Sequence, residues 1–169
     1  MAIQTKAAIR AVRTISGTPL PKQHVPEKLG LTAKKGALCF VNGGGYLDEC
    51  AAKPALVLGI MTGDGQNTAT NGLKNQIVEL AMPGVLFRGY VDFGLVETSG
   101  TTAAADLFKK YGVAKSATGG VWFIDKQETT AANVVIWEFA NDGNQAVGDI
   151  RHHVLFSFIS AKFQGLVGA

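Results

Sequence analysis

Short apolar runs separated by turn residues constrain the fold of this chain more than any other feature. The runs are rich in Val, Ile, Phe and Trp, and each is bounded by Gly, Pro, Asn, Asp or Thr, which is typical of strands. About eight strands at this spacing, with one inserted helix, predict a mainly β chain folded as a single β-barrel or jelly-roll-like sandwich. The expected strands are 37–41, 46–50, 55–62, 75–82, 85–93, 121–125, 134–139 and 150–159.

Two pairs of runs are close enough in sequence to predict hairpins. Residues 37–41 and 46–50 flank the turn Asn42–Gly45, and 75–82 and 85–93 flank Pro83-Gly84. Gly89 lies inside the second pair, where we expect a bulge or a bend at a barrel corner. The continuously apolar run 55–62 is typical of a strand that is covered on both faces.

One segment has the pattern of a helix with marked ends. Thr101 or Thr102 is a good N-cap, Asp106 lies near the positive end, and Lys109 and Lys110 lie near the negative end. Gly112 follows as a left-handed C-cap. The sequence therefore predicts one short helix from about residue 102 to residue 111.

The charge distribution divides the 169 residues into a basic N-terminal arm, 1–35, and a body, 36–169. The arm has seven basic residues and one acidic residue, a net charge of +6, whereas the body carries −3. Prolines in the arm exclude a long helix. We expect an extended arm ordered by an electrostatic partner, with a solvated tail as the alternative. The candidate contact residues are Arg10, Arg13, Lys22 and Lys28.

The two cysteines, Cys39 and Cys50, lie in or beside apolar runs. Buried free thiols are the simpler expectation, although the spacing leaves a disulfide open. No apolar run has the form of a signal peptide or reaches the roughly 18 residues of a membrane span. We expect a protein synthesised in the cytoplasm that has no membrane partner.

Candidate chemistry is sparse. His152 and His153 are adjacent, so in a strand they point to opposite faces, and metal or general-base chemistry would need partners that the sequence does not indicate. Asp64 lies in a Gly-Asp-Gly turn without the remaining residues of a calcium loop. Trp122 and Trp137 could line a sugar site, but core packing is the simpler interpretation. We predict no catalytic residue, no metal, no cofactor and no direct contact with nucleic acid.

The segment from the expected helix onwards resembles auxiliary head proteins of tailed double-stranded DNA bacteriophages, called cement or decoration proteins. The resemblance covers about the last 60 residues. It rests on Ala104–Val113, on Thr118–Lys126 with its Val121-Trp122-Phe123-Ile124-Asp125 core, on the strand ending at Phe139, and on Arg151–Ser160.

This resemblance implies a β-barrel or jelly-roll body, frequently a homotrimer, that sits on the capsid surface of the virion and clamps neighbouring major capsid subunits. Members of the family often use an extended terminal arm for the clamp, and residues 1–35 suit that role. The first alternative is a structural protein of the phage tail or baseplate. The second is a small β-barrel ligand-binding protein or enzyme that uses His152 or His153 with a carboxylate.

Overall fold

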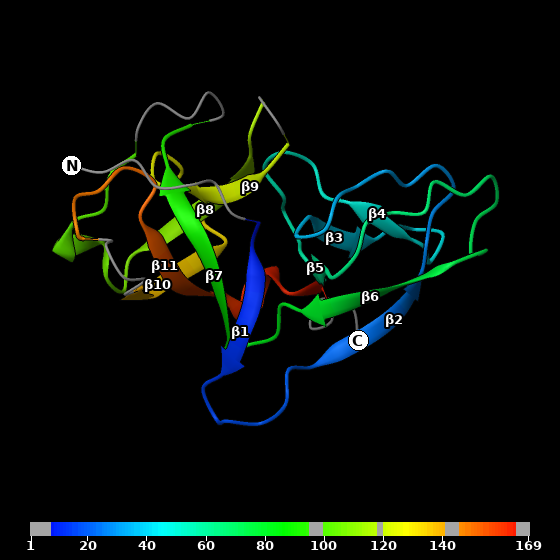
Figure 1. Ribbon diagram of the computed structural model, residues 1–169, viewed down its shortest axis with the longest axis horizontal. Helices are drawn as coiled ribbons and strands as arrows, with labels where there is room; N and C mark the ends of the chain where they lie inside the picture. The colour runs from blue at the N-terminus through cyan, green and yellow to red at the C-terminus, as the bar shows by residue number, and fades with distance from the viewer. Residues whose placement is uncertain (1–7, 95–99, 118–119, 141–145, 165–169) are drawn as a thin grey trace.

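Strands in two sheets form the framework of the structure, a computed structural model that describes residues 8–94, 100–117, 120–140 and 146–164 (Figure 1). The mainly β barrel or sandwich is thereby confirmed. The helical elements in these residues are two 3₁₀ turns, η1 (Ala104–Asp106) and η2 (Ser160–Lys162). The strands are β1 (Arg10–Thr14), β2 (Lys22–Pro26), β3 (Leu38–Val41), β4 (Leu47–Glu49), β5 (Gly59–Met61), β6 (Asn75–Leu80), β7 (Val85–Asp92), β8 (Lys110–Lys115), β9 (Trp122–Asp125), β10 (Val134–Phe139) and β11 (His153–Phe158).

The first sheet closes into a barrel. Its order is β1-β7-β11-β10-β8-β9, and β9 also pairs in parallel with β7, so five strands form a closed ring and β1 lies outside it. β7 pairs with β1 through its first half and with β9 at its end. Gly89 lies on this strand where Ile9 and Phe156 approach, and a Cβ there would be 3.1 Å from atoms of both side chains. Close packing explains this glycine.

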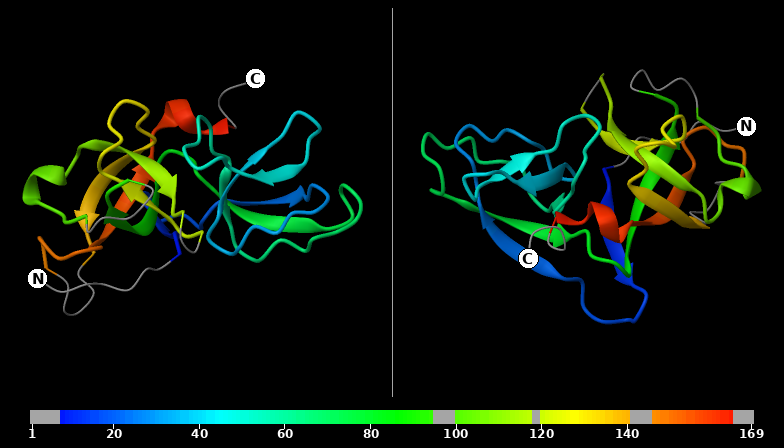
Figure 2. Two further views of the ribbon diagram at one scale, coloured as in Figure 1. Left: turned by 90° about the horizontal axis from the view of Figure 1, so that it is seen from above. Right: turned by 180° about the vertical axis from the view of Figure 1, so that it is seen from behind.

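The second sheet has the order β2-β6-β5-β3-β4 and lies beside the barrel (Figures 1 and 2). It contains the predicted hairpin of β3 and β4, in which Cys39 pairs with Glu49. The side chain of Glu49 bridges the two parts of the molecule, because it accepts a hydrogen bond from Trp122 Nε1 at 3.2 Å and pairs with Lys115 Nζ at 2.7 Å. One continuous apolar cluster runs through both sheets.

The described part of the expected arm is extended, but it belongs to the body. β1 pairs with β7, and β2 pairs with β6. Ile9, Val25 and Leu31 are buried in the common core, so residue 35 is not a boundary between an arm and a body. The prediction was wrong because these few apolar residues lie among many charged ones. Residues 1–7 of the expected arm lie outside the described residues.

The expected helix is replaced by η1 and by strand β8. Tyr111 and Val113 are buried on β8, and Gly112 allows the Glu128 side chain to approach, since a Cβ would be 2.5 Å from Glu128 Cγ. The predicted caps are wrong as well, since Ala103 precedes η1 and Gly112 lies inside β8. Barrel packing outweighs the local helix signals, as tertiary context commonly does. Thr118 and Gly119, which belong to the phage-like segment, lie outside the described residues.

Two expectations about strand pairing and length also need correction. β6 and β7 form in the expected places, but they lie in different sheets, and Pro83-Gly84 leads from one sheet to the other instead of closing a hairpin. The alternation of apolar and polar residues shows which face of a strand is buried, but it does not show which strand pairs with it. In the run 55–62 only Gly59–Met61 forms a strand, and Val57 makes an isolated bridge to Phe163.

Candidate functional site

The four predicted contact residues do not form one site. Arg10 and Arg13 lie on β1 beside the barrel, whereas Lys22 and Lys28 lie on or after β2 in the second sheet. All four are exposed. Surface ion pairs of this kind are worth about 0–1 kcal/mol, so a partner protein could replace them at little cost. Among the described residues, Arg13 pairs with Glu138 at 3.0 Å, Lys22 with Glu79 at 3.7 Å and Lys28 with Asp48 at 2.7 Å.

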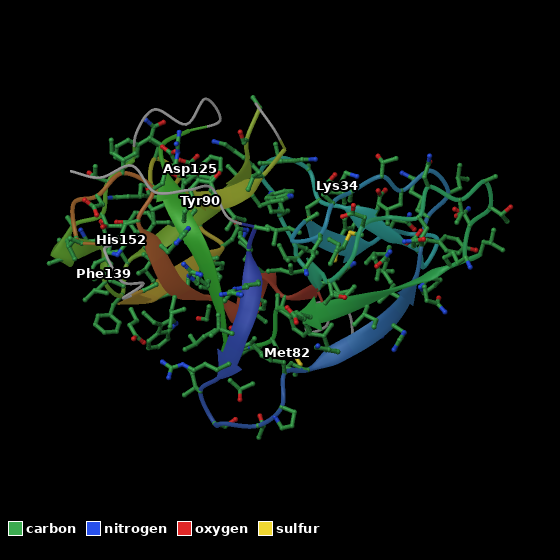
Figure 3. All side chains as sticks on the ribbon, in the orientation of Figure 1. Lys34, Met82, Tyr90, Asp125, Phe139 and His152 are labelled. Atoms are coloured by element: carbon green, nitrogen blue, oxygen red, sulfur yellow. The ribbon has the colours of Figure 1, made fainter. Side chains whose placement is uncertain are left out.

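The adjacent histidines face different surroundings, with His153 at the start of β11 and His152 just before it. The ring of His152 stacks on Phe139 with centroids 5.4 Å apart, and its Nδ1 lies 2.8 Å from Thr102 Oγ1 (Figure 3). Burial lowers the pKa of His152, so the neutral imidazole is favoured. His153 Nδ1 lies 2.6 Å from Arg88 Nη2, a donor that requires this nitrogen to accept. The two rings therefore do not converge on one reacting atom.

Buried acidic groups on the barrel anchor turns. Asp92 and Asp125 are paired in register at the ends of β7 and β9 (Asp125 is labelled in Figure 3). Asp92 accepts hydrogen bonds from the N–H groups of Phe93 and Gly100, and Asp125 accepts one from Gly94. These bonds hold both ends of the connection that follows β7. Sequence reasoning did not single out either carboxylate, although each Asp comes at the end of an apolar strand, which was a usable signal.

Asp106 organises the turn that replaces the helix. Its carboxylate accepts hydrogen bonds from Lys126 Nζ, the Tyr111 hydroxyl and the Ala103 N–H, each at 2.7 Å. Burial raises the pKa of Asp106, but these three hydrogen bonds outweigh burial and lower it overall. Burial and the neighbouring carboxylate raise the pKa of Tyr111. The group is a fully bonded anchor that fixes the backbone entering residue 108.

Phe108 and Trp137 form an aromatic pair on the outer surface of the barrel. Their ring centroids are 5.9 Å apart with the planes at 88°, and 66% of Phe108 and 41% of Trp137 are exposed. Trp137 Nε1 donates to Ser157 Oγ at 2.7 Å. The expectation that both tryptophans are in the core is correct for Trp122, which is 1% exposed, and wrong for Trp137.

Further apolar side chains are exposed in two other places. Ile15 and Met82 lie on the neighbouring β1–β2 and β6–β7 connections, where a shallow groove is also lined by Pro19 and Pro83 (Met82 is labelled in Figure 3). Leu29 and Leu73 are exposed on the loops of the second sheet. Exposed apolar groups that gather in patches are typical of surfaces that bind other proteins.

The remaining candidates have structural roles. Cys39 and Cys50 are free and buried, and burial raises the pKa of both thiols, which makes them poor nucleophiles. The carboxylate of Asp64 accepts the Lys35 N–H at 2.8 Å, as a turn residue does. Within the described ranges, no three His, Cys, Asp or Glu side chains are grouped so that they could hold a metal ion.

Comparison of the chain with models of protein families and with curated proteins gave no match. Across the described residues, none of the helical segments has the length and apolar character that a membrane-crossing helix needs.

Proposed function

We propose that this protein is a structural component that binds other proteins, specifically a cement protein of a tailed phage head that clamps neighbouring major capsid subunits. The observation that supports this best is the exposed pair of Phe108 and Trp137 on a closed barrel. Large aromatic side chains held on a rigid surface are the groups that contribute most at protein interfaces. The resemblance of the segment after residue 104 to phage cement proteins supports the same role.

The protein would stabilise the shell by burying additional surface where neighbouring capsid subunits meet. A standard interface buries roughly 800 Å² on each partner, and a homotrimer would repeat it three times with a high effective concentration for the second and third contacts. Each subunit would thus add modest affinity, while the trimer resists separation of the capsid subunits that it bridges.

The basic residues of β1 and β2 would act as part of a fixed surface in this proposal, not as a flexible arm. Arg13, Lys22 and Lys28 are held at defined positions by partners in the same chain. Because these pairs are exposed and weak, acidic groups of the capsid could compete for the cations. Arg10 on β1 is paired with Arg88 on β7, so the two positive charges add at that point on the barrel.

The test is binding to shells assembled from the major capsid protein encoded in the same genome. We expect saturable cosedimentation with expanded shells and a higher temperature of shell disruption, with the free protein sedimenting as a trimer in ultracentrifugation. Binding to purified tails but not to heads would favour the tail or baseplate alternative. A protein that binds neither particle would contradict the proposal.

A further inference from the structure

We infer that Phe108 and Trp137 form a preformed docking site for an apolar side chain flanked by carboxylates on the partner protein. We call Phe108, Trp137 and the neighbouring Lys109 and Lys110 the aromatic patch. The inference rests on the proposed function, because it identifies the part of the molecule that contacts the capsid subunit and the chemistry of the surface it contacts.

The backbone at Phe108 is the first reason. Its φ is +61°, a left-handed conformation that is rare for a bulky side chain and that glycine or asparagine adopts more easily. The conformation is enforced from both sides, since Asp106 anchors the preceding turn and the Phe108 N–H donates to the Ile136 carbonyl at 2.7 Å. Yet the ring is 66% exposed and gains little from burial in its own chain. Strain of this kind is concentrated at functional positions.

The position of Trp137 is the second reason. The register between β10 and β11 shifts between Ile136 and Glu138, so Trp137 lies at a β-bulge. Bulges redirect a side chain out of the regular alternation. The hydrogen bond from Trp137 Nε1 to Ser157 then fixes the indole. Two separate backbone irregularities therefore place two large rings against each other on the outside of the barrel.

Charge specifies the partner. Lys109 and Lys110 are exposed next to Phe108, and neither makes an ion pair within the described part of the chain, whereas Lys53, Lys115 and Lys126 are all paired. In a two-fold contact between two copies, these lysines would face each other across the interface. A different protein that presents Asp or Glu around an apolar side chain fits the patch better, and in the proposed function that protein is the major capsid subunit.

Two variants at residue 108 separate docking from folding. Phe108→Ala removes the ring and keeps a strained residue, and Phe108→Gly removes both the ring and the strain. We expect Phe108→Gly to melt at a higher temperature than Phe108→Ala, and both to bind expanded shells at least tenfold more weakly than the wild type. Ile77→Ala, at a 38% exposed apolar residue on β6 of the second sheet, is the matched control and should bind like the wild type.

A charge reversal tests the chemistry of the partner. Lys109→Glu/Lys110→Glu should weaken shell binding and make it less sensitive to salt, whereas Lys74→Glu, at another exposed and unpaired lysine in the described residues, should leave both unchanged. If wild-type protein binds shells and both Phe108 variants bind equally well, the aromatic patch is not the docking site. If the wild-type protein binds no shell, the proposed function is wrong, and the capsid subunit is not the partner of the aromatic patch.

Discussion

The barrel and the second sheet are stabilised in different ways. The six largest fully buried side chains, all aromatic, lie on the barrel strands β7, β9 and β11, and the rings of Phe87, Phe156 and Phe158 are within 5.2–6.0 Å of one another. The second sheet has strands of three to six residues, and the larger buried side chains on them are aliphatic, such as Leu38 and Ile60. Phe87, Trp122, Phe156 and Phe158 belong to the apolar cluster that runs through both sheets, whereas Tyr90 and Phe123 stack on each other in a smaller, separate cluster.

The second sheet relies on polar side chains that bind the backbone of its loops. Glu27 is fully buried and accepts hydrogen bonds from Gln76 Nε2 at 2.5 Å and from the Gln66 N–H. Asn42 Oδ1 accepts the Gly44 N–H within the β3–β4 turn. In loops, where no neighbouring strand supplies carbonyl acceptors, such side-chain hydrogen bonds satisfy the backbone N–H groups. The barrel uses such anchors too, at Asp92, Asp106 and Asp125, but its large buried rings add rigid packing, so a rigid surface patch is better placed there.

Truncating the aromatic core is expected to have the largest effect and tests this contrast most directly. Phe156→Ala should lower the free energy of unfolding by about 4 kcal/mol, because a fully buried ring is removed between Phe87 and Phe158. Phe40→Ala, at a half-buried ring of the second sheet, should cost about 1–2 kcal/mol. Urea denaturation of both variants provides the measurement. Equal losses would remove the distinction between the two regions.

A smaller effect is expected when the polar anchor of the second sheet is altered. Glu27→Gln keeps the size of the side chain but places an NH₂ group among donors, so it should cost about 2 kcal/mol. Hydrogen exchange should show faster opening of residues 63–72 and unchanged protection on β7 and β11. Glu138→Gln, the same change at an exposed carboxylate on β10 of the barrel, serves as the control and should leave both measurements unchanged. Faster exchange throughout the barrel would show that the two regions do not open separately.

The strands that could be predicted from sequence are those whose own composition is typical of a strand, whichever strand they pair with. Val134–Phe139 and His153–Phe158 carry enough β-branched and aromatic residues to be recognised alone. β1 and β2 were expected to form an extended arm because each has one buried residue among exposed or half-buried ones, and β8 was expected to end a helix because Lys109, Lys110 and Gly112 have the pattern of a helix C-terminus. Partner choice also depends on the whole fold, which is why β6 and β7 were wrongly paired with each other.

The candidate site was less predictable than the fold. The different contacts of His152 and His153 were expected, although β11 begins at His153 and His152 lies just before the strand. The exposure of Trp137 depends on a bulge, and that of Phe108 depends on a left-handed backbone, and neither feature has a sequence signal at these residues. Both arise only when β8 and β10 come together in the barrel.

The pH dependence of stability should be the smallest effect, and it also distinguishes the two regions. Burial lowers the pKa of His152 below its ordinary value of 6.5, and the Ala140 backbone and the charge of Asp149 oppose this shift without overcoming it. Near and below pH 6.5 the unfolded chain therefore binds more protons at this residue than the folded chain. Its contribution to stability is complete above pH 6.5 and is lost as the pH falls towards the folded-state pKa.

Replacing His152 and His24 in separate variants assigns this pH dependence to one region. His152→Gln should flatten the decline in unfolding free energy between pH 7 and pH 5, while His24→Gln, on exposed β2 of the second sheet, should preserve it. Asp106 does not interfere, because its lowered pKa places its loss of stabilisation in a more acidic range. Denaturation midpoints at several pH values give the measurement. If His24→Gln flattens the decline and His152→Gln does not, the titration belongs to the second sheet, and the barrel is not the pH-sensitive region.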